Sequence, residues 1–168
     1  MLHMIQIIPF HKDLQNQIVD LILHIQQIEF QIPITAEDQP DLFIVDEFYR
    51  KNGGQFWLAI YEGKVVGSIA LIRIGNNAGV IRKMFVQKEF RGKEFRTAQL
   101  LFDTLEDYCT ASGIRNVYLG TMDKLGAAIR FYEKNGFEII SKEALPEDFP
   151  LMPVDNVFCR LKIRKFQS

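Results

Sequence analysis

Residues 84–97 of the chain read Met84-Phe85-Val86-Gln87-Lys88-Glu89-Phe90-Arg91-Gly92-Lys93-Glu94-Phe95-Arg96-Thr97. The pattern is typical of the end of a strand, a short basic turn with one glycine, and the beginning of a long helix. Such a turn points several free backbone N–H groups and the positive end of the helix dipole at one spot. Phosphate groups bind at such spots, and Arg91 and Lys93 add mobile positive charge there. The stretch therefore predicts a turn that binds the pyrophosphate of a nucleotide-like cofactor.

The composition predicts one globular domain over residues 1–168. Hydrophobic residues make up 48% and charged residues 24% of the chain, which is ordinary for a soluble protein. The 20 basic and 21 acidic residues nearly cancel, so no global charge favours a nucleic acid or an anionic membrane as partner. No segment reaches the roughly 18 apolar residues of a membrane span, and the N-terminus lacks a charged leader with an apolar block. We therefore expect a cytoplasmic protein with no nucleic-acid or membrane partner.

The two cysteines, Cys109 and Cys159, follow no metal or redox spacing. Cys109 lies on the apolar face of a predicted helix and Cys159 lies in a predicted strand. We expect both to be small buried hydrophobic residues, which is the usual setting of free cysteine. We expect no metal site.

The first third of the chain predicts a short strand at residues 5–8 and two helices. The first helix covers residues 12–30, because apolar residues recur at helical spacing; they are Leu14, Ile18, Leu21, Ile25 and Ile28. Asp38 and Pro40 are typical of the start of a second helix, which Gly53-Gly54 would end.

The rest of the chain predicts a three-stranded meander followed by alternating helices and strands. The meander strands are residues 55–61, 64–74 and 79–86, joined by glycine-containing turns. After the basic turn come a helix ending at Gly113, a strand at 116–120, a helix at 124–135 capped by Asp123 and stopped by Gly136, and strands at 138–141 and 157–163.

This order predicts an α+β fold with α/β/α layering, in which a single mixed, mostly antiparallel sheet has helices on both faces. A dinucleotide-binding Rossmann fold fits poorly, because the glycine turn follows three meander strands and lacks Gly-x-Gly-x-x-Gly. The Gly-x-x-x-x-Gly-Lys-Ser/Thr motif of the P-loop is also absent.

Several motifs together resemble the core of the GNAT N-acetyltransferase superfamily, over roughly residues 56–140. The Arg-Gly-Lys turn alone would be a weak signal. The Phe-Tyr-Glu-Lys-x-Gly-Phe run that follows a strand ending in Thr makes the combination specific. The matching residues are Met84-Phe85-Val86, Arg91-Gly92-Lys93, Leu100-Leu101, Tyr118-Leu119-Gly120-Thr121 and Phe131-Tyr132-Glu133-Lys134-Asn135-Gly136-Phe137.

The resemblance implies a transferase that moves an acetyl group from acetyl-CoA, its co-substrate, to a primary amine by direct attack through a tetrahedral intermediate. In this family the strand end pairs with the pantetheine arm and the turn holds the pyrophosphate, while strands 79–86 and 116–120 splay apart around the cofactor. The implied cofactor-binding residues are Met84, Phe85, Val86, Arg91, Gly92, Lys93, Glu94, Phe95, Arg96, Thr97, Thr121 and Phe131.

The sequence departs from the family pattern at three positions. Glu94 and Arg96 stand where relatives have the later glycines of the turn, and glycine there lets the backbone approach phosphate closely. Leu125 stands where the family often has Asn, so one polar contact to the cofactor is missing.

The resemblance assigns catalysis to Tyr132. CoA leaves as a thiolate when the tetrahedral intermediate collapses, and a phenol near the sulfur supplies a hydrogen bond or a proton. A general base is harder to assign, because the strand before the turn reads Val80-Ile81-Arg82-Lys83 and has no carboxylate. Asp46, Glu47 and Asp155 are the candidates. A backbone N–H near Met84 or Phe85 is expected to hold the oxyanion.

The acceptor is left open as a small-molecule amine, an amino acid or a peptide, and its specificity is expected to lie in residues 31–50 and 145–156. A homodimer is also left open. Two other functions compete with acetyl transfer: an acyl-CoA-binding regulatory or sensor module without turnover, and an interaction domain without a cofactor. The missing strand carboxylate favours the sensor, whereas Tyr132 favours the enzyme.

Overall fold

The computed structural model describes residues 4–164, which form two compact units. The first unit comprises residues 4–72 and 82–107, and the second comprises residues 73–81 and 108–164. Strands are hydrogen-bonded in the order β1-β2-β3-β4-β5-β7-β6, so one mixed seven-stranded sheet is formed, as the sequence predicts. The α+β class is thereby confirmed.

The strands follow the predicted positions closely. They are β1 (Gln6–Pro9), β2 (Gln55–Tyr61), β3 (Lys64–Ile74), β4 (Ala78–Val86), β5 (Asn116–Thr121), β6 (Glu138–Ile140) and β7 (Val157–Lys162). The β1–β2, β2–β3, β5–β7 and β6–β7 pairs are antiparallel. The parallel pair is β4–β5, where Ala78–Val80 lie opposite Asn116–Tyr118. The wider splay of these two strands stays a prediction.

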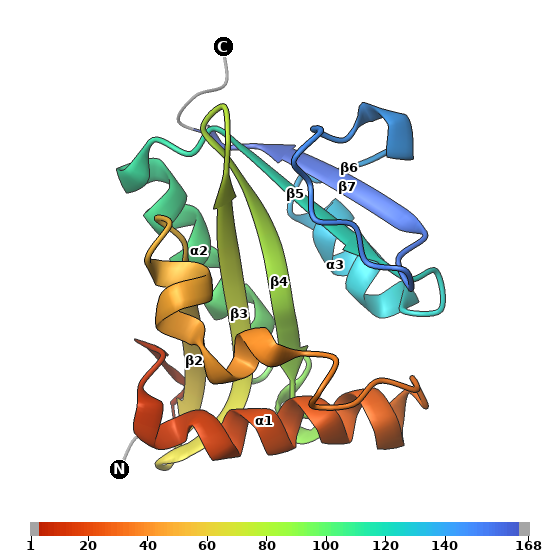
Figure 1. The fold of residues 1–168 in the computed structure, drawn as a ribbon. Helices are drawn as coiled ribbons and strands as arrows, with labels where there is room; N and C mark the ends of the chain where they lie inside the picture. Colours follow the sequence, from red (N-terminus) through yellow and green to blue (C-terminus); the bar gives the residue numbers. More distant parts are fainter. Residues whose placement is uncertain (1–3, 165–168) are drawn as a thin grey trace. The chain divides into compact units, whose positions relative to one another are not determined.

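Helices cover both faces of the meander in the first unit (Figure 1). On one face, α1 (Gln15–Leu23) contributes Ile18 and Ile22 to a core that includes Leu58 of β2. On the other face, Leu101 of α2 (Thr97–Ser112) packs beside Gly67 of β3. The faces are opposite because Gly67 pairs with Ala59, the neighbour of Leu58, and successive strand residues point to opposite sides.

The first predicted helix is not regular along its whole length. A 3₁₀ turn, η1 (Lys12–Leu14), precedes α1, and a π-helical turn, η2 (His24–Glu29), follows it. The amide of Phe30 donates to the carbonyl of Ile25, five residues back, at 3.0 Å. This wider turn shifts the apolar stripe, and Ile28, predicted to belong to the stripe, is 66% exposed.

The second predicted helix does not form as one element. Residues 38–53 contain a 3₁₀ turn, η3 (Pro40–Phe43), and a second π turn, η4 (Asp46–Arg50). Ile44, between them, has φ −138° and ψ 48°, outside the helical region. The prediction of a continuous helix was therefore wrong.

The second unit confirms most of the predicted elements. α3 runs over Gly126–Lys134, and Gly136 has φ 95°, as expected of a left-handed helix stop. Asp123 does not cap α3, because the residue before the helix is Leu125 and no side chain caps it. Further 3₁₀ turns are η5 (Lys88–Phe90) in the first unit and η6 (Lys142–Ala144) in the second. No helix in residues 4–164 is long and apolar enough to span a membrane.

A substitution at Gly54, just after η4, tests how closely the backbone approaches β3 there. A Cβ atom at this position would clash with the carbonyl oxygen of Leu71 and lie 2.9 Å from that of Tyr49. We expect Gly54→Ala to lower the free energy of unfolding by about 3 kcal/mol, because backbone atoms must move. Denaturant unfolding measures the loss.

Gly63→Ala is the matched control. Gly63 has φ 81°, and no atom lies within 4 Å of the place that a Cβ would occupy. Only the left-handed backbone conformation is therefore penalised, at about 1 kcal/mol. Equal losses in the two variants would contradict the close approach at Gly54.

Candidate functional site

The basic turn between β4 and α2 presents a row of free backbone donors. Gly92 and Arg96 have φ 102° and 54°, and the Arg96 amide donates to the Gly92 carbonyl at 3.2 Å, which closes the turn. Within the described part of the chain, the N–H groups of Gly92, Lys93, Glu94 and Phe95 have no hydrogen-bond acceptor. Four consecutive free N–H groups before a helix of 16 residues form a place where an anion can bind.

Arg96 explains how the turn forms with few glycines. Its φ of 54° lies in the left-handed region, which favours glycine. The turn thus keeps the conformation that glycine permits, at a cost on the order of 1 kcal/mol. The Thr97 hydroxyl donates to the Phe90 carbonyl at 2.8 Å and ties the start of α2 to η5. The Lys93 and Glu94 side chains are exposed.

Arg91 does not supply the mobile charge that the sequence suggested. Its Nε donates to the Val86 carbonyl at 2.8 Å, and its Nη2 donates to Glu29 Oε1 at 2.8 Å. A second guanidinium nitrogen pairs with the other carboxylate oxygen of Glu29. The hydrogen bond from Arg91 lowers the pKa of the Glu29 carboxyl. Arg91 therefore ties the strand end to η2, whereas the other two cations of the turn, Lys93 and Arg96, are exposed.

The Phe95 side chain points into an aromatic cluster and so can meet a ligand through its backbone. Its ring centroid lies 5.5 Å from that of Tyr61 and 5.0 Å from that of Phe90. Before the turn, Phe85 packs against the core of the first unit, and Met84 is half-buried. The predicted roles of residues 84–86 in cofactor binding stay predictions.

A polar cluster in β4, which sequence reasoning missed, lies immediately before Met84. Lys83 has φ 54°, and its side chain is 6% exposed. Its Nζ donates to Gln39 Oε1 at 2.6 Å and lies 3.7 Å from Asp41 Oδ2. Burial lowers the pKa of the Lys83 ammonium to about 8, although the charge of Asp41 acts in the opposite direction. The Lys83 carbonyl accepts from the Ser68 hydroxyl at 2.6 Å.

The partners of Lys83 are themselves fixed by two residues on the π turns. Gln26, on η2, exchanges amide hydrogen bonds with Gln39 at 3.1 and 2.8 Å. Tyr49, on η4, donates its hydroxyl to Asp41 at 2.5 Å. Burial, followed by the charge of Asp41, raises the pKa of the Tyr49 phenol, so it stays a neutral donor.

The predicted catalytic tyrosine lies in the second unit, on α3. Tyr132 is 6% exposed, and its ring lies 5.8 Å from Phe131 and 5.5 Å from Phe137, centroid to centroid. Burial, with a smaller contribution from Cys159, raises the pKa of the phenol. Its hydroxyl has no hydrogen-bond partner among residues 4–164. A neutral phenol of this kind can donate a hydrogen bond to an anion.

The other predicted site residues of the second unit have structural partners. Thr121 is buried at the end of β5, and its carbonyl accepts from the Asn156 amide at 2.9 Å. Phe131 is half-buried. Cys109 and Cys159 are both buried, as predicted, and burial raises the pKa of the Cys159 thiol to about 11.

The three base candidates differ in their surroundings. Asp46 forms an exposed ion pair with Arg50 at 2.8 Å, and Glu47 is exposed. Asp155 lies in the second unit, where its amide donates to the Met152 carbonyl at 3.1 Å. Nothing in the described residues groups three or more His, Cys, Asp or Glu side chains as a metal site would require.

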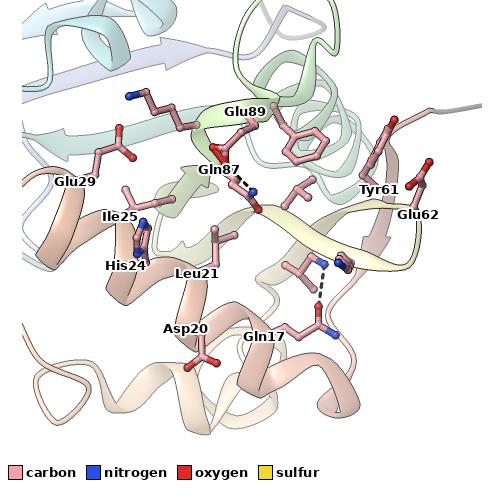
Figure 2. Close-up of a pocket in the computed structure, with 15 residues that line it drawn as sticks. Gln17, Asp20, Leu21, His24, Ile25, Glu29, Tyr61, Glu62, Gln87 and Glu89 are labelled. Carbon is pink, nitrogen blue, oxygen red and sulfur yellow. Dashed lines mark hydrogen bonds between the residues drawn. The ribbon is translucent and has the colours of Figure 1, made fainter.

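A pocket of about 830 Å³ opens in the first unit between α1, the β2–β3 hairpin and residues 87–90. Figure 2 shows acidic side chains around it, namely Asp20, Glu29, Glu62 and Glu89. None of the residues predicted from the sequence to bind a cofactor lines this pocket. It adjoins the predicted turn through Glu29, the partner of Arg91.

A family profile and a solved structure both relate this chain to acetyltransferases. Residues 19–137 match the profile described as the acetyltransferase (GNAT) family. A crystal structure of a GNAT-family acetyltransferase from Staphylococcus aureus Mu50 has a TM-score of 0.91 and 40% identity, covering 95% of this chain and 99% of that one.

Two further proteins are similar to this chain, one in sequence and one in fold. The N-acetylaspartate synthetase of Danio rerio is 28% identical over 76% of this chain, which spans 46% of that relative. The PaiA N-acetyltransferase of Thermoplasma acidophilum, solved in complex with coenzyme A, shares the fold, with a TM-score of 0.72 and 16% identity over 94% of this chain and 98% of that one. The chain thus spans less than half the length of the curated relative.

The low pKa of Lys83 is directly testable. We expect the ε-¹³C resonance of Lys83 to titrate near pH 8 rather than at its ordinary value of 10.5. Between these pH values the unfolded chain binds a proton that the folded chain lacks, so the contribution of Lys83 to stability increases as the pH rises through this window. A titration of ¹³C-lysine-labelled protein by NMR measures the midpoint.

Two variants that each remove one carboxylate provide a test and a control for this titration. Asp41→Asn removes a charge that raises the Lys83 pKa, so the midpoint is expected to fall further below 8. Asp46→Asn, which breaks only an exposed pair with Arg50, is expected to leave it unchanged. A wild-type midpoint near 10.5 would show that Lys83 is not buried as described.

Proposed function

The chain belongs to the acetyltransferase (GNAT) family, and we propose that it transfers an acetyl group from acetyl-CoA to a primary amine through a tetrahedral intermediate. One observation carries the proposal: four consecutive free N–H groups at Gly92–Phe95 precede α2. They lie where the family resemblance puts the CoA pyrophosphate. The CoA complex of the Thermoplasma acidophilum structure, which shares this fold, supports the same ligand.

The proposed cofactor contacts follow from the backbone of β4 and the turn. The N–H groups of residues 92–95 receive the pyrophosphate oxygens, and Lys93 adds a side-chain cation. Glu94 is exposed and can point away from the anion. The backbone of Met84–Val86 pairs with the pantetheine arm, and an N–H at Met84 or Phe85 holds the oxyanion. One such donor contributes on the order of 3 kcal/mol to transition-state stabilisation.

The reaction is a direct group transfer. The neutral amine nitrogen attacks the thioester carbonyl carbon, and a C–N bond forms while the carbonyl oxygen becomes an oxyanion. The attacking nitrogen, which is now positively charged, loses one proton to solvent. When the intermediate collapses, the C–S bond breaks and the electron pair leaves with the CoA sulfur. The products are an N-acetylated amine and free CoA.

Tyr132 acts on the leaving sulfur in this proposal. A thiol has an ordinary pKa of about 8.5, below the value of about 10 for a phenol. Burial raises the Tyr132 pKa further, so full proton transfer to the thiolate is uphill. We therefore assign Tyr132 the role of a hydrogen-bond donor to the thiolate, which takes its proton from solvent.

The acceptor belongs to one of the three classes left open by the sequence, namely small-molecule amines, amino acids and peptides. The N-acetylaspartate synthetase of Danio rerio is named for an acetylated amino acid, and this similarity favours the amino-acid class for the present chain.

A combined binding and turnover assay tests the function. We expect acetyl-CoA and CoA to raise the melting temperature, because the turn binds them in the folded state alone. We expect free thiol to appear when acetyl-CoA is mixed with an amine from a broad panel. Absence of any stabilisation by CoA would overturn the proposal. Stabilisation without thiol release across the panel would favour the acyl-CoA sensor instead.

Replacement of Tyr132 tests its assigned role. We expect Tyr132→Phe to lower kcat by about 10- to 100-fold, the effect of one hydrogen bond to a charged group, and to leave the CoA-induced shift in melting temperature unchanged. Tyr118→Phe, on β5, is the control and should keep wild-type turnover. Loss of CoA binding with normal turnover per bound enzyme would contradict the role.

A further inference from the structure

The unexplained positive charge of β4 lies directly before the strand end that is proposed to hold the acetyl group. Arg82 and Lys83 precede Met84 in a strand whose upstream residues Val80 and Ile81 are buried and apolar. Two consecutive cations are unusual in such a strand, since burying charge is costly unless it is compensated. The groups around Arg82 and Lys83 therefore show how far their positive charges are compensated.

Lys83 has hydrogen-bonding capacity that the protein does not use. An ammonium group has three N–H donors. One donates to Gln39 at 2.6 Å, and a second points toward Asp41, whose Oδ2 lies 3.7 Å from Nζ in an ion pair. No other acceptor for Nζ is present among residues 4–164. A side chain that is 6% exposed thus has one donor more than Gln39 and Asp41 engage.

The charges around Lys83 do not balance. Asp41 is the carboxylate paired with Lys83, and it already accepts the Tyr49 hydroxyl. Arg82 is half-buried and close enough to lower the pKa values of Lys83 and Tyr49. Its side chain forms no ion pair or hydrogen bond within the described residues. Two cations therefore face one carboxylate, and the cluster has an excess of positive charge that an anion would neutralise.

The scaffold holds this charge in a fixed position. Lys83 has a left-handed backbone conformation, its carbonyl is bound by Ser68, and its partners are braced by Gln26 and Tyr49. Gln26 and Tyr49 both lie on π turns, which are rare and often occur at functional sites. Such bracing is what a specific binding group needs in order to keep its orientation.

We propose that Arg82 and Lys83 bind the carboxylate of the acceptor, which is therefore an amino acid. This inference rests on the proposed acetyl transfer, because the acetyl group at Met84 fixes where the acceptor amine lies. A carboxylate one or two carbons from that amine reaches the residues just before Met84. The planar guanidinium of Arg82 suits a carboxylate, and Lys83 adds a charge-assisted donor.

Matched acceptor pairs test the inference. Thiol release from acetyl-CoA is measured with free amino acids, including aspartate, glutamate and β-alanine, and with matched amines in which every carboxylate is replaced by an amide. We expect kcat/KM for the best acid to exceed that of its uncharged counterpart by about 100-fold or more. Arg82→Gln and Lys83→Met should each remove most of this preference, mainly by raising KM. Lys12→Gln and Arg115→Gln, both exposed, serve as controls.

A second readout works without turnover and is insensitive to misfolding of a variant. In wild-type protein saturated with CoA, the bound carboxylate of an acid acceptor should raise the titration midpoint of the Lys83 ε-¹³C resonance, whereas the amide should not. Equal turnover of acids and amides would overturn the inference while leaving acetyl transfer intact. The inference would also be overturned if CoA stabilised the protein but no acid either reacted or raised the titration midpoint of Lys83. Failure of CoA to bind at all would instead overturn the proposed function.

Discussion

The buried ammonium group of Lys83 is the constraint on which the shape of the first unit depends. A lysine inside a sheet loses the hydration of its charge, and the protein must offer polar partners at short range. Gln39 and Asp41 provide them from a segment far away in the sequence. Gln39 lies just before η3 and Asp41 lies inside it, so both side chains reach one nitrogen from a segment that is not a regular helix.

The parts of the fold dominated by apolar periodicity could be predicted from the sequence. The meander strands, α2 and the glycine stop of α3 follow alternation, helical spacing and backbone freedom, which are local properties. The broken second helix and the exposed Ile28 could not be predicted, because buried polar contacts between distant residues override local preference there. The same holds for Arg91, whose partner Glu29 is 62 residues away.

In the candidate site, too, local features could be predicted from the sequence, whereas contacts between distant residues could not. The conformation of the turn at residues 91–97 could be predicted, because a strand, a glycine and a helix start suffice for it; its binding of a cofactor stays a prediction. Arg96 adopts the left-handed conformation that its residue type made unexpected. The polar partners of Lys83 come from distant segments and could not be predicted, although the sequence carries a signal. Two adjacent cations, Arg82 and Lys83, interrupt a buried strand, and such a pair indicates compensating polar groups nearby.

The two π turns have an evolutionary consequence. A π turn contains one residue more than the α-helical turn that it replaces, and each residue rotates a helix by about 100°. Loss of one residue at η2 or η4 would therefore turn Gln26 or Tyr49 away from the partners of Lys83, with little effect on the strands. Single-residue insertions and deletions at these two places offer relatives a way to rewire the surroundings of the buried cation and to change what it recognises, while the sheet and the cofactor turn stay as they are.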